Sequence, residues 1–244
     1  MEQNMYSPNQ TSGKIFPALI LAIGVATGGY YIGSGIKYFR NFDRSVEVKG
    51  LAEQQVKSDL ATWSVNFSDS GDNLKALYQQ SSQNQKLVNQ FLISNGFESK
   101  NIQLGTISVN DNWANQYGNN NEKLPHYQIN NSVSVTTANV DLVAKVSQNA
   151  GDLVNQGVIV TNNSISYFYN NLNSIKAQML DQATQNAKSA AETFAKNTSS
   201  QVGKIKSASQ GVFTISSPDG SNAGDTTNIN KKVRVVTSIQ FFLN

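Results

Sequence analysis

Cysteine is absent from the 244 residues, and histidine occurs once, at position 126. Without cysteine the chain has no disulfide framework, no thiol nucleophile and no cysteine-ligated metal. A lone histidine is also a poor basis for a zinc site, which uses several His, Cys or carboxylate ligands at short spacing. We therefore expect no metal and no cofactor, and the residues identify no small-molecule ligand.

Charge of either sign is sparse, and neither sign is clustered. The chain has 19 Lys and Arg against 16 Asp and Glu, for a formal net charge of +3. A nucleic-acid-binding protein normally gathers its basic residues on one face. Since the basic residues here are scattered, we expect no nucleic-acid partner.

The usual signatures of a hydrolase are missing as well. No G-x-S-x-G motif occurs, and His126 lies beside Pro125 and Tyr127 in a segment that reads as a loop. Most acidic residues lie near predicted helix starts or in loops, where capping and solvation explain them; the set is Asp69, Asp72, Asp111, Glu122, Asp141, Asp152, Asp219 and Asp225. We expect no enzyme. A monomeric exported ligand-binding module or hydrolase with a site near His126 stays open as the alternative.

What the sequence does contain is one long uncharged segment, residues 15–36, between Lys14 and Lys37. If this segment is helical, with a rise of about 1.5 Å per residue, it is just long enough to cross a hydrocarbon core of roughly 30 Å. A dinucleotide-binding loop would need the spacing G-x-G-x-x-G between a strand and a helix, which these glycines do not provide. The sequence therefore predicts a short tail over 1–14, a transmembrane signal anchor in contact with membrane lipid over 15–37, and a linker over 38–44.

Small residues recur at helical spacing within this segment. Gly24 with Gly28, and Gly29 with Gly33, are four residues apart, a spacing that lets two membrane helices pack closely. Glycine is also simply common in membrane helices, which is an equal explanation. A signal peptide cleaved near Ala26 is the second choice, because the apolar run is longer than the usual signal.

From residue 45 onward, strand-like and helix-like segments alternate, as in an α+β domain. Strand patterns cover 46–48, 56–67, 102–109, 127–137, 158–169, 202–215 and 233–243. Helical patterns cover 72–95, 140–155 and 174–197, the first with Gly96 as its stop. Two polar segments, 111–126 and 216–231, are longer than ordinary connections.

The periodicity also predicts which side chains are buried. In the strands we expect Ala61, Trp63, Val65 and Phe67 to share the core face, and likewise Val233, Val235, Ile239, Phe241 and Leu243. In the helices we expect Leu74, Leu77, Ser81, Val88, Phe91 and Leu92, then Val143, Val146, Ala150 and Leu153, then Ile175, Met179, Ala183, Ala187, Ala190 and Phe194. Trp113 and Tyr117 lie in a polar loop instead and are candidate interface residues.

An ordered set of segments resembles a known family. The set begins with V-x-V-x-G at Val46, Val48 and Gly50, continues with "NQFLISNGFESKNIQLGTISVND" and "YQINNSVSVTT", and closes with "VRVVTSIQFFL". Residues 45–244 are thereby similar to the SIMPL domain (DUF541) of bacterial periplasmic and outer-membrane-associated proteins. The resemblance implies an α+β domain of antiparallel or mixed sheet with three helices, here behind one transmembrane helix.

The resemblance also implies export and self-association. Members of the SIMPL family form ring-like or channel-like homo-oligomers and are loosely linked to envelope or oxidative stress. No enzymatic activity is established for them. Lys37, Arg40, Arg44 and Lys49 outnumber Lys14, a count that alone would keep the domain cytoplasmic, but this rule is weak for long translocated domains. We expect a single-pass inner-membrane protein with a periplasmic domain, or a cleaved periplasmic protein as second choice.

Overall fold

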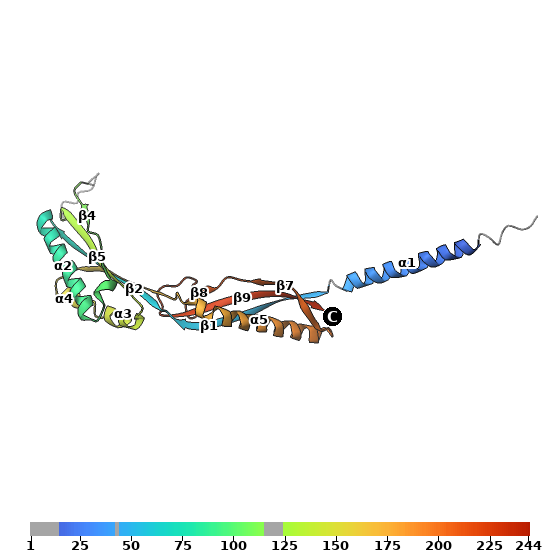
Figure 1. The fold of residues 1–244 in the computed structure, drawn as a ribbon. Coiled ribbons are helices and arrows are strands. Elements are labelled where there is room, and N and C mark those ends of the chain that lie inside the picture. The colour runs from blue at the N-terminus through green and yellow to red at the C-terminus, as the bar shows by residue number, and fades with distance from the viewer. Residues whose placement is uncertain (1–14, 42–43, 115–123) are drawn as a thin grey trace, which may run out of the picture. The chain divides into compact units, whose positions relative to one another are not determined.

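A computed structural model describes residues 15–41, 44–114 and 124–244 (Figure 1). The fold is α+β with antiparallel strand pairs, as predicted. It divides into two compact units. Unit 1 comprises the chain up to Leu51 with 183–211 and 237–244, and unit 2 comprises 52–182 with 212–236.

Unit 2 contains a five-stranded sheet covered by helices on one face. The strands are β2 (Leu60–Gly71), β3 (Ile102–Leu104), β4 (Ser108–Asp111), β5 (Tyr127–Thr137) and β6 (Val160–Phe168). Their order is β3-β5-β2-β6, with β4 also paired to β5, and all four pairings are antiparallel. The helices are α2 (Leu74–Ser94), the 3-10 turn η1 (Ser99–Asn101), α3 (Val140–Ser147) and α4 (Gly151–Asn155).

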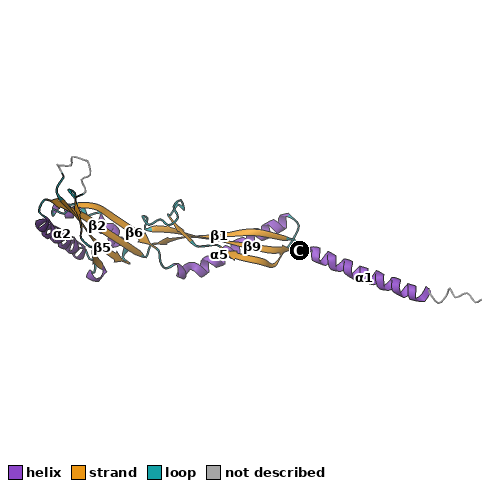
Figure 2. Ribbon diagram, turned by 90° about the horizontal axis from the view of Figure 1, so that it is seen from above, coloured by secondary structure: helices purple, strands orange, loops and turns teal. Residues whose placement is uncertain are grey.

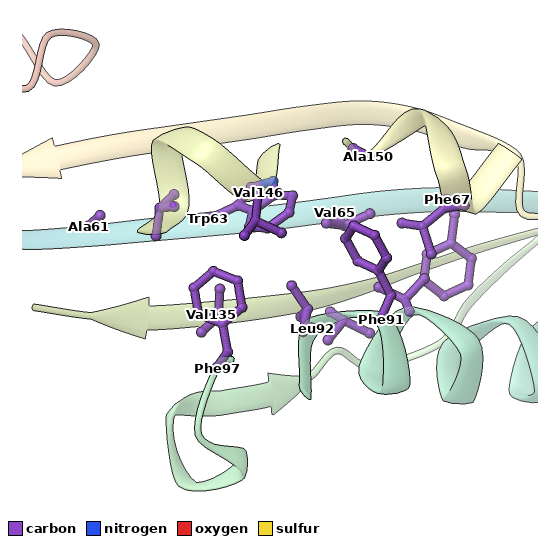
Figure 3. Packing of buried hydrophobic residues seen from close by; sticks show 14 of the residues in the cluster. Ala61, Trp63, Val65, Phe67, Phe91, Leu92, Phe97, Val135, Val146 and Ala150 are labelled. Carbon is purple, nitrogen blue, oxygen red and sulfur yellow. The ribbon is translucent and has the colours of Figure 1, made fainter. Parts of the chain in front are cut away.

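The core of unit 2 lies between this sheet and its helices. Ala61, Trp63, Val65 and Phe67 alternate along β2 and are at most 1% exposed, which confirms the predicted core face and the core position of Trp63. Figure 3 shows three of these β2 side chains, Trp63, Val65 and Phe67, beside Phe91 and Leu92 of α2. The opposite face carries hydroxyl and amide groups, such as the Thr62–Thr136 pair with its oxygens 3.2 Å apart.

The second sheet has the order β1-β9-β7, with β8 also paired to β9. Its strands are β1 (Ser45–Lys57), β7 (Val202–Gln210), β8 (Thr214–Ser216) and β9 (Asn230–Leu243). Helix α5 (Leu172–Asn197) begins in unit 2, and its part from Ala183 onward belongs to unit 1, where it runs along β1 and β9 (Figure 2). Its residues Ala187 and Ala191 pack with Val46 of β1 and with Ile239 and Phe241 of β9.

The buried stripe of α5 differs in part from the prediction. Met179, Ala183 and Ala187 are buried as expected, but the stripe continues through Ala191 and Ala195, whereas Ala190 is exposed and Phe194 is 48% exposed. A strict four-residue spacing keeps one row of alanines against β1. Gly50 of β1 explains the closeness, because a Cβ added there would lie 1.8 Å from the Ala183 carbonyl oxygen.

Four predicted strands were wrong in their bounds. Segment 46–48 is only the beginning of β1, which continues to Lys57. Segment 56–67 is broken at Ser58 and Asp59, where β1 ends, because the Asp59 carboxylate accepts hydrogen bonds from the Asn170 and Asn171 N–H groups. Segment 102–109 is divided after Leu104, where Gly105 crosses within contact of Ser132. Segment 202–215 is likewise divided into β7 and β8.

The helices also differ in detail. The predicted helix 140–155 is two helices, α3 and α4, separated at Gln148–Ala150, so the domain has more than the three helices expected. Asn73 and Asn139 provide the side-chain N-caps of α2 and α3, a role that the sequence had assigned to acidic residues. Leu74 is 41% exposed, and Asn84 is buried on α2 instead. Gly96 ends α2 with φ of 94°, as predicted.

The predicted anchor falls on a single helix, α1 (Ile15–Asn41). Its side chains are described for 19–35, and Leu21, Val25 and Ile32 among them are more than 60% exposed. Added Cβ atoms at Gly24, Gly28, Gly29 and Gly33 would meet nothing within 4 Å. Among the residues whose side chains are described, no helix is long and apolar enough to cross a membrane.

Candidate functional site

The chemically densest surface site lies where β4 ends and β5 begins, at the two ends of the first long loop. The His126 ring is stacked between two aromatic rings, with centroid distances of 4.1 Å to Trp113 and 3.8 Å to Tyr127. The His126 N–H donates to Asp72 Oδ1 at 2.9 Å, and the Asn112 N–H donates to the His126 carbonyl at 2.9 Å. These bonds hold the two loop ends together.

Asp111, the last residue of β4, completes this aromatic cluster. Its Oδ1 accepts hydrogen bonds from the Trp113 and Ala114 N–H groups at 2.9 and 3.0 Å, and it lies 3.2 Å from His126 Nε2. The hydrogen bond from the Ala114 N–H, followed by that from Trp113 and the nearby His126, holds the pKa of Asp111 below its ordinary value. The carboxylate therefore stays ionised at neutral pH and orients the imidazole.

The His126 ring has aromatic contacts on its faces and one carboxylate contact at Nε2. Of the side chains that the structure describes, Asp111 is the one within hydrogen-bonding distance of the His126 ring, so no hydroxyl there is paired with a histidine base. Over the same described residues, no group of three or more His, Asp or Glu side chains could hold a metal ion. What the cluster offers a partner is a flat aromatic surface beside an anionic group.

Trp113 and Tyr117 were the predicted interface residues here. Trp113 is 50% exposed, with one ring face on His126 and its Nε1–H donating to the Leu124 carbonyl at 3.3 Å. Local packing of Trp113 is therefore observed, and its role at an interface stays a prediction. Tyr117 lies in 115–123, outside the described residues. The sequence analysis did not predict the roles of Asp111 and Tyr127. The position of Tyr127 directly after His126 was a signal that could have indicated the ring stack.

A second polar cluster is buried beneath α2. Asp69 of β2 is 2% exposed, and its Oδ1 accepts a hydrogen bond from Asn84 Nδ2 at 2.7 Å, while Oδ2 has no hydrogen-bond partner among the residues that the structure describes. Asn131 and Ser81 lie beside it and are also buried. Burial raises the pKa of Asp69, against the opposing effect of Ser81 and Asn84. This corrects the interpretation of Asp69 as a capping or solvated residue.

The second long loop is ordered by a buried ion pair. Lys231 Nζ lies 2.9 Å from Asp225 Oδ2 and 2.5 Å from the Asp225 carbonyl oxygen, with side chains 1% and 3% exposed. Thr227 and Asn228 donate further hydrogen bonds to the carboxylate. The Thr227 hydroxyl, helped by Lys231 and Asn228, holds the pKa of Asp225 far below its ordinary value. The sequence had placed Asp225 in a solvated loop, which was wrong.

Comparison with known proteins adds the family to this geometry. No curated protein sequence matches the chain significantly. Residues 46–241 match the family described as SIMPL, protein of unknown function (DUF541). The match runs from the first strand of the domain into the last, and it includes both long loops, the aromatic cluster and the buried ion pair. The chain therefore belongs to the SIMPL (DUF541) family, as its segment order predicted.

Proposed function

We propose that this chain is a membrane-anchored, non-enzymatic protein of the bacterial cell envelope whose exported SIMPL domain forms a ring-like or channel-like homo-oligomer. The observation that carries the proposal is the contrast between the two ends of the chain. A helix with exposed apolar side chains precedes a domain whose surface offers contact sites but no catalytic arrangement among its described residues. A role in envelope or oxidative stress remains a prediction from the family resemblance alone.

The anchoring part of the proposal rests on α1. Leu19, Ile20, Leu21, Ile23 and Val25 are all more than half exposed in a helix that extends beyond the uncharged segment at its C-terminal end. Burying such side chains in hydrocarbon is favourable, by about 1.5–3 kcal/mol for each large apolar one. Lipid, or another copy of the same helix packed along its glycines, is the environment that this surface fits.

The self-association part rests on the domain surface. Apolar side chains such as Val212 and Ile159 are 84% and 60% exposed in unit 2, and Trp113 presents an open aromatic face. Exposed apolar side chains mark a contact site where they form one contiguous patch. A closed ring needs a contact that repeats through a rotation, and identical copies of one such surface and its complement supply it.

Measuring the oligomer mass of the full-length chain and of a chain that begins at Ser45 tests both the anchoring and the self-association parts of the proposal. The full-length protein in detergent is expected to be a defined oligomer, and a chain beginning at Ser45 is expected to keep the same subunit number but leave the membrane fraction. A strictly monomeric Ser45 chain would refute assembly by the domain. A membrane-fraction protein whose intact mass shows that it begins after Ala26 would refute the anchor instead.

His126 tests the alternative of a binding or hydrolytic site. Replacing His126 with alanine removes two stacking contacts and is expected to cost about 1 kcal/mol of folding stability while leaving the oligomer mass unchanged. His126→Phe is the matched control, because it keeps the aromatic stack and removes the ring nitrogens. If both variants assembled normally but lost a measurable envelope phenotype, the chemistry of the imidazole would be required, and a binding or hydrolytic site near His126 would replace the non-enzymatic part of our proposal.

A further inference from the structure

The two sheets leave several strand edges without a neighbour among the described residues, and most of these edges are guarded against pairing. The β1 edge carries Glu47, Lys49, Glu53 and Lys57. The β7 edge carries Lys204 and Lys206, and its register against β9 shifts twice. Charged side chains and irregular register are the usual devices that stop a free edge from pairing with another chain.

The two ends of the five-stranded sheet differ in the same respect. At one end, β3 and β4 have only three and four residues and are separated by Gly105–Ile107. At the other end, β6 is nine residues long and contains no charge, proline or glycine. Its residues Asn162, Asn163 and Ser164 are exposed. Of the longer edge strands that the structure describes, β6 is the one without a charged side chain, and its register against β2 shifts only once, near Asn162.

The hydrogen-bonding pattern shows which backbone groups β6 presents. The Tyr167 N–H points away from β2, because it donates to the Thr226 carbonyl at 2.7 Å. In an antiparallel strand alternate residues point the same way, so Ile165 and Asn163 direct their N–H and C=O groups to the free edge. Thr226 limits this edge at one end, and the register shift opposite Asn66 and Phe67 limits it at the other.

We propose that β6 pairs in antiparallel fashion with β6 of a second copy of this chain, about a two-fold axis at Ser164. This register places Asn163 of each copy opposite Ile165 of the other as hydrogen-bonded pairs, which satisfies the N–H and C=O groups of both residues. Ser164 then faces Ser164 in the non-hydrogen-bonded pair on the axis, where side chains are closest. A two-fold contact is isologous, so the same edge serves both copies.

Among the longer edge strands that the structure describes, the composition of β6 fits this partner best. In an isologous pair each residue before the axis meets the residue equally far beyond the axis in the other copy, and an uncharged strand such as β6 places no like charges opposite each other. The inference rests on the proposed homo-oligomer and names one of its contacts. A ring is closed by a separate, heterologous contact between neighbouring subunits. The two-fold β6 contact then joins one ring to a second ring.

Charge reversal on the axis tests this contact in the full-length chain. Ser164 is exposed, pairs with Ser64 of β2, and has a side chain on the sheet face away from the core, so substitutions there leave the core unchanged. Ser164→Lys puts two ammonium groups opposite each other and is expected to reduce the oligomer to half its mass or less. Ser164→Glu is expected to do the same. An equimolar mixture of the two variants, refolded or coexpressed, should recover the wild-type mass.

The other end of the sheet provides the matched control. Gln103→Lys with Ser108→Lys adds positive charge at exposed positions of β3 and β4 and is expected to leave the oligomer mass unchanged. An intact oligomer in Ser164→Lys, or dissociation in the β3/β4 control instead, would overturn the β6 contact while the proposed homo-oligomer stood. A monomeric wild-type chain would overturn both proposals together.

Discussion

Replacing Gly50 with alanine is expected to lower the free energy of unfolding by about 3 kcal/mol, because no space exists for the added methyl group. Its Cβ would lie 1.8 Å from the Ala183 carbonyl oxygen and 2.6 Å from the Ala187 backbone nitrogen. Both are backbone atoms of α5, so relief requires the helix to move off β1. That movement would open the packing of Ala187 and Ala191 on Val46, Ile239 and Phe241.

Thermal unfolding measures this effect. A loss of about 3 kcal/mol corresponds to a fall of roughly 6–12 °C in melting temperature for a chain of this size. Gly151→Ala is the matched control, since Gly151 begins α4 with nothing within 4 Å of an added Cβ. Alanine there should be neutral or stabilising by up to about 1 kcal/mol. Equal melting temperatures for the two variants would show that α5 does not lie against Gly50.

Local periodicity was sufficient for the parts of the fold in which one face is plainly apolar. The alternation through Trp63 and Phe67 and the stripe through Val88 and Leu92 each determine a buried face within one segment. The sequence determined less clearly which side of α5 faces the sheet. Alanines at several adjacent helical positions give no contrast in size, so the choice between Ala190 and Ala191 depends on the approach of Gly50, which is distant in sequence.

The polar sites were predicted less well, for a related reason. Trp113 and His126 were recognisable because aromatic and histidine residues are uncommon in polar loops. The partnership of Asp111 with His126 was not, because it joins the two ends of a loop. Buried Asp69 and Lys231 had no signal at all, since charged residues are by default expected at the surface. Only the fold shows that each has hydrogen-bonding partners there.

The buried Lys231–Asp225 pair leads to the second large expected effect. Lys231→Met is expected to cost about 4 kcal/mol, because it leaves the Asp225 carboxylate buried without its cation. The control is Lys188→Met. Its partner Glu192 is 3.8 Å away on the surface of α5, and such an exposed pair is worth about 0.5 kcal/mol or less.

The pH dependence gives this prediction a signature that a packing defect would lack. In the wild type the pKa of Asp225 is lowered on folding, so its contribution to stability is present above the ordinary aspartate pKa of about 3.9 and is lost as the pH falls further. Lys231→Met removes part of that contribution. The stability difference between the two proteins, measured by denaturant unfolding, should therefore be largest at neutral pH and shrink below about pH 4.

A double variant separates the ion pair from the rest of the loop. Adding Asp225→Asn to Lys231→Met removes the unpaired charge while retaining one oxygen, in the place of Oδ1, to which the Thr227 hydroxyl can still donate. The double variant is therefore expected to lose less free energy of unfolding than the sum of the losses in the two single variants. The difference, which is the coupling between the sites, is expected to be about 1–3 kcal/mol. Additive losses would mean that each side chain acts alone, and the order of the second loop would then depend on its own turns and not on the pair.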